Sequence, residues 1–356
     1  MNIPNIRLLN QQLVAPQFSE VHDMVSWMGM LQAQEYRMMR WAVGTRLKRP
    51  SMKAVEAAYD AGKIIRTHLF RCTWQLVAAE DLRWMLQLCA DKNRSTINGY
   101  TAYYGRTISE KEYDHANNLI HQVLTGHTSM TKKELLSHLA EYGFTEDTRL
   151  ISIYLRRAEA DGVICSGKLD SRENTYALVD ERVPGSSDLT REEAVVRLAQ
   201  KYFHGHSPAT LEDFVWWSDL NIGECRIAMN TIRGELLEER YEGSTYYIHQ
   251  DCRIRGGCPR TILLPSYDEY LIGYKSRQHV IEEEYRDKAY SRNGIFYPVI
   301  VHDGKIIGNW HPSKEATFFK EEYKVDIGDA IAKHRAFLSE SSRRNSLWDI
   351  TLFYDE

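Results

Sequence analysis

The order of the predicted elements constrains the fold of this chain more than any other feature. Three times along the sequence, apolar residues at helical spacing are followed by two short runs rich in β-branched and aromatic residues, with a polar turn between them. The paired runs are residues 64–69 with 73–77, 162–167 with 175–179, and 236–240 with 245–248. Helices followed by a hairpin are the outline of a winged helix, a variant of the helix-turn-helix motif.

Capping residues place helices next to these paired runs. Thr131 precedes Glu134 by three residues, the spacing of a capping box at a helix start. Ser51 and Gly62 bracket another predicted helix, and Ser19 is a predicted N-cap. We predict further helices over residues 36–47, 79–88, 147–161, 189–203 and 222–233. The units do not repeat at a fixed period, which argues against a solenoid.

The sequence changes character after residue 260. Residues 261–265 and 297–301 read as strands, residues 302–305 as a tight turn, and residues 327–339 as a final helix. We therefore predict an α+β chain with three tandem winged-helix domains and a small β-rich, barrel-like C-terminal domain. The predicted domain boundaries are residues 1–125, 126–184, 185–255 and 256–356.

Composition excludes several classes of protein. The chain of 356 residues is too long for one small core, and its mean hydropathy of -0.48 and lack of long apolar runs argue against a membrane protein. Six scattered cysteines form no C-x-x-C pair, which favours free thiols over disulfides or zinc. No signal peptide is evident, so we expect a cytoplasmic protein. We also expect a monomer without cofactor or metal.

Positive charge is concentrated in one stretch of a chain whose net charge is -4. Between Arg37 and Arg71 there are nine lysines and arginines and only two acidic residues, Glu56 and Asp60. A nucleic-acid-binding protein of negative net charge must segregate its basic residues in this way, because phosphate contacts dominate affinity. The other reading is an ordinary solvated face.

Two glutamines directly precede the basic stretch, within the sequence Leu31-Gln32-Ala33-Gln34. Residues two apart do not face each other on a helix, but they point the same way in an extended backbone. If both amides serve one site, the backbone must therefore be extended there or lie at a helix end. Taken alone, such a pair is ordinarily a surface feature.

Several segments together make the chain resemble the winged-helix DNA glycosylases typified by AlkZ and YcaQ. The segments are residues 31–34, 66–74, 79–84, 161–167, 208–210 and 264–271. The resemblance spans nearly the whole chain and depends on the order of these segments. It implies tandem winged helices, a C-terminal β-barrel and a concave face that binds double-stranded DNA. The chain departs from the family at Gln75, where a histidine is expected in many relatives.

The resemblance also implies that Gln32 and Gln34 match the family's catalytic element, in its double-glutamine form. A glutamine amide can hold a water molecule but cannot act as a strong general base. N-alkylated purines suit such a site, because the cationic ring leaves readily from the sugar. The adjacent Glu35 should point away from the pair if the backbone is extended, so we do not expect it to be the base.

Nine basic residues are predicted to contact DNA. They follow the glutamine pair, occupy the first hairpin, or lie on the helix and turn of the second unit. They are Arg37, Arg40, Arg66, His68, Arg71, Arg156, Arg157, Lys168 and Arg172. For His68 and Arg71 the other reading is the polar face of a hairpin.

Three functions are compatible with these observations. The first is a monofunctional DNA glycosylase that hydrolyses the N-glycosidic bond of N-alkylated purines, including those in interstrand crosslinks. The second is a non-catalytic winged-helix DNA-binding protein such as a transcription regulator, although no dimerisation helix is evident. The third is an RNA-binding or scaffold protein that uses the basic stretch.

Overall fold

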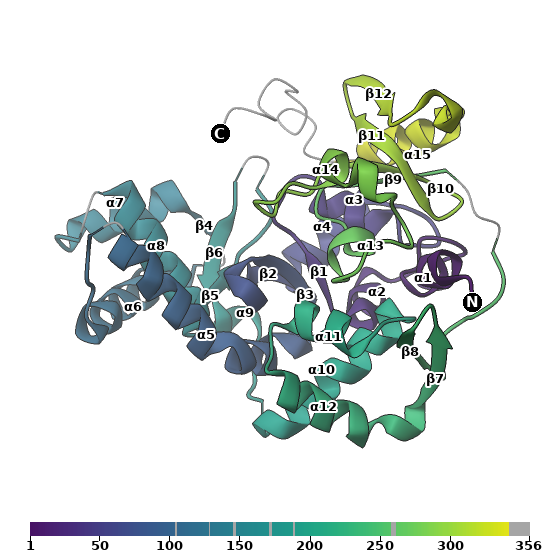
Figure 1. Ribbon diagram of the computed structural model, residues 1–356. Helices are drawn as coiled ribbons and strands as arrows, with labels where there is room; N and C mark the ends of the chain where they lie inside the picture. Colours follow the sequence, from purple (N-terminus) through teal and green to yellow (C-terminus); the bar gives the residue numbers. More distant parts are fainter. Residues whose placement is uncertain are drawn as a thin grey trace. The chain divides into compact units, whose positions relative to one another are not determined.

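The computed structural model describes residues 1–103, 105–127, 129–144, 147–170, 173–187, 189–257 and 261–341 (Figure 1). The predicted mixture of helices and several small sheets is confirmed. The chain divides into two compact units. The discontinuous unit combines Met1–Glu56 with the described part of Val195–Glu356, and the inserted unit is Ala57–Ala194. This division is coarser than the four predicted domains, whose boundaries stay predictions.

The N-terminal segment of the discontinuous unit contains four helices and one short strand. They are α1 (Ile3–Asn10), α2 (Val21–Met28), β1 (Met30–Gln32), α3 (Met39–Gly44) and α4 (Met52–Asp60), the last of which crosses into the inserted unit. The N-cap of α2 is Glu20 and not the predicted Ser19. The helix predicted over residues 36–47 is shorter, because residues 34–38 form a bend and a turn.

The second segment of this unit begins with three helices and a hairpin. They are α10 (Arg191–His206), α11 (Leu211–Ser218), α12 (Ile222–Thr231), β7 (Leu236–Tyr241) and β8 (Ser244–His249). Thr210 caps α11, and its hydroxyl oxygen accepts a hydrogen bond from the backbone N–H of Asp213. The helices and the hairpin predicted for this region are therefore confirmed.

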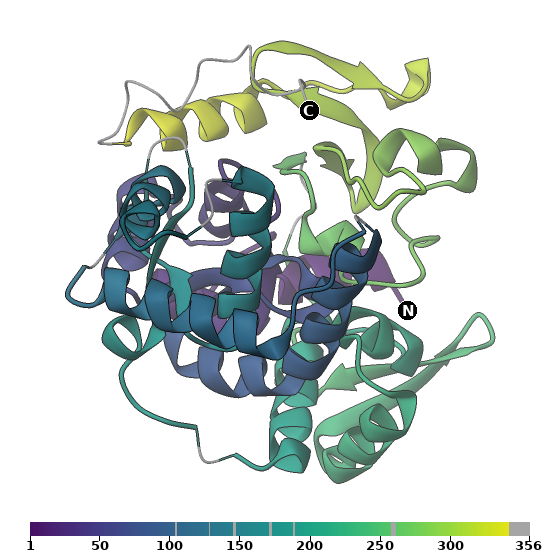
Figure 2. The same cartoon turned by 90° about the vertical axis from the view of Figure 1, so that its left-hand side faces the viewer.

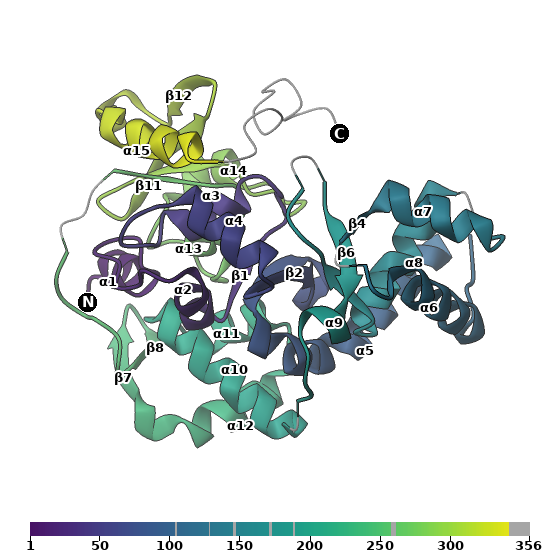
Figure 3. The same ribbon diagram turned by 180° about the vertical axis from the view of Figure 1, so that it is seen from behind.

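The C-terminal segment forms a four-stranded antiparallel sheet of order β12-β11-β10-β9. Its elements are β9 (Ile262–Leu264), α13 (Glu269–Ile272), α14 (Arg286–Ala289), β10 (Val299–His302), β11 (Lys305–His311), β12 (Lys314–Phe318) and α15 (Gly328–Ser339). Helix α15 is drawn in yellow in Figure 3 and contacts β9 and α3. The unpredicted α1 contributes Leu8 and Leu9 to the core of this sheet. The first helix of the chain is thus packed against its last domain.

The inserted unit holds two small antiparallel sheets among helices, and these helices are coloured blue and teal in Figure 2. Its elements are β2 (Ile64–His68), β3 (Trp74–Ala78), α5 (Leu82–Tyr103), α6 (Glu110–Leu124), β4 (Met130–Thr131), α7 (Lys132–Glu141), α8 (Thr148–Ala160), β5 (Ile164–Ser166), β6 (Thr175–Leu178) and α9 (Val179–Arg182). The capping box of Thr131 and Glu134 is confirmed, and Ser109 with Glu112 forms another at α6. None of the helices in the described ranges has both the length and the apolar character of a membrane span.

Candidate active site

The two glutamines lie where a short strand ends. Gln32 is the last residue of β1 and is 6% exposed, whereas Gln34 lies in the following bend and is exposed. The backbone at Gln32 is extended, as the prediction of a shared site requires. The pair therefore has one amide residue anchored in the protein and one at its surface.

Gly29 makes the sharp change of direction from α2 into β1. Its φ of 75° lies in the left-handed region, which favours glycine. A Cβ atom at this position would lie 3.0 Å from Cβ of Lys201 on α10. The ammonium of Lys201 in turn donates to the backbone carbonyl of Ser26, at 3.0 Å. Helix α10 thus packs tightly against the end of α2 and sets where β1 begins.

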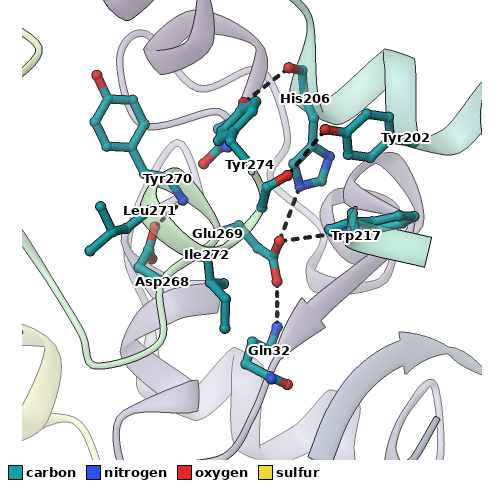
Figure 4. A network of polar contacts seen from close by, with 12 residues as sticks. Gln32, Tyr202, His206, Trp217, Asp268, Glu269, Tyr270, Leu271, Ile272 and Tyr274 are labelled. Carbon is teal, nitrogen blue, oxygen red and sulfur yellow. Dashed lines mark hydrogen bonds and ion pairs between the residues drawn. The ribbon is translucent and has the colours of Figure 1, made fainter. Parts of the chain in front are cut away.

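The carboxylate of Glu269 holds the glutamine strand in place (Figure 4). The backbone N–H of Gln32 donates to Oε1 of Glu269 at 2.7 Å. The other oxygen, Oε2, accepts from the indole of Trp217 at 3.1 Å and lies 3.2 Å from Nε2 of His206. Glu269 is only 3% exposed, and these donors satisfy its two oxygens inside the protein. It fixes the backbone of Gln32 through the backbone N–H.

The neighbouring Asp268 anchors the loop that carries Glu269. Its two oxygens accept from the guanidinium of Arg46 at 2.7 and 2.8 Å, and both side chains are fully buried. The same guanidinium donates to Oε1 of Gln11 at 3.2 Å and to the carbonyl of Ala42 at 2.8 Å. Arg46 is one of the nine lysines and arginines in the basic stretch from Arg37 to Arg71. Its charge is instead neutralised inside the protein.

Aromatic residues surround His206 on the side away from Gln32 (Figure 4). The ring of Tyr202 stacks on the imidazole at 4.8 Å, and its hydroxyl donates to the carbonyl of Gly273. The hydroxyl of Tyr274 donates to the backbone carbonyl of His206 at 2.9 Å. Burial raises the pKa of both tyrosines well above the usual value, so their hydroxyls stay protonated donors. The position of His206 is therefore fixed from several directions.

Glu35, next to the pair, has a local structural contact. One of its carboxylate oxygens accepts a hydrogen bond from the backbone N–H of Met38, in the turn that precedes α3. This contact is the kind that stabilises the start of a helix. That Glu35 does not serve as a general base stays a prediction.

The predicted DNA-binding residues of the N-terminal segment differ in exposure. Arg37 is half-buried, while Arg40 is 1% exposed and its guanidinium lies 4.9 Å from the ring centre of Tyr36. The structure does not bring Arg40 to the surface. Contacts of both residues with DNA stay predictions.

The first hairpin holds Arg66 and His68 inside the inserted unit. The imidazole of His68 contacts a carboxylate oxygen of Glu159 at 2.6 Å, and burial lowers its pKa below 6.5 even though Glu159 acts in the opposite direction. Neutral His68 thus donates to Glu159. The guanidinium of Arg66 lies 3.8 Å from the ring centre of Trp74 and donates to Asn174. Both residues have structural partners, and their contacts with DNA stay predictions.

Gln75, the departure from the family pattern, braces the turn of this hairpin. Its amide oxygen accepts from the backbone N–H of Phe70 at 3.2 Å, and its amide nitrogen donates to the carbonyl of the same residue at 3.3 Å. The turn needs such support, because Arg71 and Cys72 have φ values of 61° and 52°. Arg71, a predicted DNA contact, is half-buried on this turn.

The remaining predicted contacts lie on α8 and the turn after β5. Arg157 is 4% exposed and is paired with Asp161 at 2.8 Å and with Glu110. Arg156 is half-buried, and Lys168 is exposed. Arg172 lies outside the described residues. None of these contacts with DNA is tested by the geometry, and all stay predictions.

Among the described residues, one group of side chains could hold a metal ion, formed by His204, His249 and Asp251. These residues were not predicted as ligands. Glu269 was also missed as a site residue, although it lies in a segment, residues 264–271, that contributed to the family resemblance. The signal was present, but nothing in the sequence paired that segment with Gln32.

Comparisons of the chain with known proteins all indicate the same protein family. The family model described as "DNA glycosylase AlkZ-like" matches residues 25–318. A curated relative from Streptomyces sahachiroi, an "Interstrand DNA cross-link repair glycosylase", is 24% identical over 338 residues and 90% of each chain. The solved structure of Streptomyces sahachiroi DNA glycosylase AlkZ superposes with a TM-score of 0.74 at 21% identity. It covers 96% of this chain and 95% of its own.

Proposed function

Because the chain belongs to the AlkZ-like DNA glycosylase family, we propose that it is a monofunctional glycosylase that hydrolyses the N-glycosidic bond of N-alkylated purines in duplex DNA. The observation that carries this proposal is the buried Glu269 carboxylate on the backbone N–H of Gln32. A glutamine pair without a function does not require a buried carboxylate that fixes its backbone. A pair that must orient a reactant to within a fraction of an ångström requires such support.

The proposed chemistry follows from the properties of the amides. Gln32 and Gln34 position a water molecule against the C1′ carbon of the sugar, and their oxygens stabilise the positive charge that develops there. The alkylated purine is already cationic and departs as a neutral base, so no acid needs to protonate it. Glu269 is a positioning residue in this scheme, because its oxygens are occupied by protein donors.

We also infer the finer architecture that the family resemblance implies. The three helix-and-hairpin units act as winged helices on double-stranded DNA, and the C-terminal sheet of β9 to β12 belongs to a barrel-like domain. The protein acts as a monomer in this proposal.

The name of the curated relative points to a substrate class. That relative is a repair glycosylase of interstrand crosslinks. We propose that this chain likewise accepts alkylated purines that are joined to the opposite strand. Crosslinked duplex and duplex with N7-methylguanine therefore belong in the same assay.

The decisive experiment measures base release from both duplexes by the wild type and by Gln32→Ala/Gln34→Ala. We expect release by the wild type and a loss of at least about 100-fold in the double variant, with duplex binding intact. Gln87→Ala, an exposed glutamine on α5, is the matched control and should retain full activity.

Two results would contradict the proposal. Unchanged release by the double variant would remove the glutamines from the mechanism. Absence of release from either duplex by the wild type, together with tight duplex binding, would favour the non-catalytic winged-helix DNA-binding protein.

A further inference from the structure

A second group of polar residues lies next to the glutamine site, at the other side of the last turn of α10. His204 extends from this turn toward His249, the last residue of β8, and toward Asp251 in the turn that follows. One ligand atom from each of the three residues lies within 4.8 Å of the other two. All three belong to the discontinuous unit.

The spacing of these atoms is close to that of a metal site. Nε2 of His204 is 3.5 Å from Oδ2 of Asp251, and Nδ1 of His249 is 3.7 Å from the same oxygen. Ligands bound tetrahedrally at the usual zinc distances of about 2.0–2.1 Å are separated by roughly 3.3 Å. Two of the three ligand separations are therefore within a few tenths of an ångström of the value in a zinc site, and the third is at most 4.8 Å.

The imidazole of His249 is held in the orientation that metal ligands require. Its Nε2 faces a carboxylate oxygen of Glu235 at 3.1 Å, and its Nδ1 accepts from the backbone N–H of Asp251. The proton is thus on Nε2, and an ion that binds Nδ1 takes the place of the hydrogen bond from the Asp251 backbone N–H. The amide of Gln200 donates to both oxygens of Glu235, at 3.0 and 3.1 Å. A carboxylate behind a ligating histidine is the usual support of a metal site.

His204 supplies a buried nitrogen with a weak protein partner. Its Nε2 lies 3.5 Å from Oδ2 of Asp251, which is long for a hydrogen bond. The ring is stacked on Trp27 of α2, with centres 5.1 Å apart and planes 19° from parallel. A buried nitrogen with so long a contact is poorly satisfied, and a bound cation would give it a stronger partner.

We propose that His204, His249 and Asp251 bind a divalent first-row transition ion such as Zn²⁺. Two imidazoles and one carboxylate leave one coordination position for water. The ion ties the end of α10 to the end of the β7–β8 hairpin and is structural, so it takes no part in base release. The proposal is independent of the proposed glycosylase activity.

The test uses the untagged full chain after removal of metal with a chelator. Titration calorimetry with zinc alone should show one ion bound per chain, and zinc should raise the melting temperature. Asp251→Ala removes a ligand whose side chain is 63% exposed, so folding should be intact by circular dichroism. We expect zinc affinity to fall by at least about tenfold in this variant. Cobalt should give visible absorption bands in the wild type that are lost in Asp251→Ala.

His138→Ala is the matched control, because His138 is an exposed histidine paired with Glu141 on α7. Zinc affinity should be unchanged in it. The proposal is overturned if the stripped wild type binds no zinc at micromolar concentration. It is equally overturned if Asp251→Ala binds zinc as tightly as the wild type, or if His138→Ala weakens binding as much as Asp251→Ala does.

Discussion

At the scale of single residues, a buried carboxylate holds the strand that carries the candidate glutamine site. Glu269 receives the backbone N–H of Gln32 on one oxygen and faces Trp217 and His206 on the other. The N–H groups of Gln32, Trp217 and His206 all point at its oxygens. A fixed acceptor of this kind determines where the strand ends, and so where the two amides stand.

Glu269→Gln tests this role with little change of shape. The amide presents N–H groups to at least one protein donor, so we expect the free energy of unfolding to fall by about 1–3 kcal/mol and base release to slow. Urea unfolding and single-turnover release measure the two effects. Glu284→Gln changes an exposed carboxylate and should alter neither. Equal stability of Glu269→Gln and the wild type would mean that Glu269 does not hold the strand.

A second residue makes stability depend on pH. His334 is 4% exposed and packs edge-on against Trp41 and Trp310, with ring centres 4.9 and 4.8 Å apart. Burial, followed by the charge of Arg335, lowers its pKa from 6.5 to about 4. Protonation therefore favours the unfolded chain, in which the pKa is higher. The stabilising contribution of neutral His334 is complete above pH 6.5 and declines as the pH falls toward 4.

We accordingly expect acid to remove up to about 3 kcal/mol of stability through this residue. Urea unfolding of the wild type and His334→Gln at a series of pH values between 7 and 4 measures the effect. The difference in the free energy of unfolding between the two proteins should become smaller as the pH falls. A difference that stays constant over this range would show that His334 is not the titrating group.

The residues of the site could be predicted only in part. Gln32 and Gln34 stand two positions apart, and a short pattern is visible in a sequence. Glu269 is 237 residues away from Gln32, and no local rule relates the two. His204, His249 and Asp251 were missed for the same reason, since their approach depends on how α10 packs against β8.

At the scale of elements, local chemistry decided what could be predicted. The capping box at α7 lies within four consecutive residues, and the hairpin β7–β8 closes around a short polar turn. Both were predicted correctly. Helix α1 was not, because its apolar face is understood only against the C-terminal sheet that it covers. The N-cap of α2 was misplaced by one residue, a usual error at helix ends.

The turn between β2 and β3 offers a test at this scale. Gln75→Ala removes both hydrogen bonds to Phe70 from a turn with two residues at positive φ. We expect a loss of about 1–3 kcal/mol in the free energy of unfolding, measured in urea. Gln122→Ala removes a single exposed amide contact to Tyr142 and should cost less than about 0.5 kcal/mol. Similar losses in the two variants would contradict a bracing role for Gln75.

At the scale of the whole molecule, the inserted unit lies in the sequence between the two segments of the discontinuous unit. The four consecutive domains expected from the sequence stay a prediction, and composition along a chain carries no sign of such a return. Buried polar contacts join the two segments of the discontinuous unit. One of them is the ion pair between Arg46 and Asp268. Gln11 with Tyr274 is another.

Arg46→Met tests this junction. It leaves the carboxylate of Asp268 buried without its cation, and we expect a loss of about 3–5 kcal/mol in the free energy of unfolding. Arg46→Met/Asp268→Leu removes both charges and should be more stable than the single variant. Urea unfolding of the two proteins compares them directly. If the double variant is the less stable of the two, the pair is not the main source of the loss.

The separation of Gln32 and Glu269 along the chain also affects when the site can form during translation. A ribosome that has just added Gln32 must add 237 more residues before it reaches Glu269. At ordinary rates of translation this takes roughly ten to fifty seconds. During that interval the nascent protein carries both glutamines but lacks the group that holds them. Under the proposed function, we therefore expect base release only from chains that extend past Glu269.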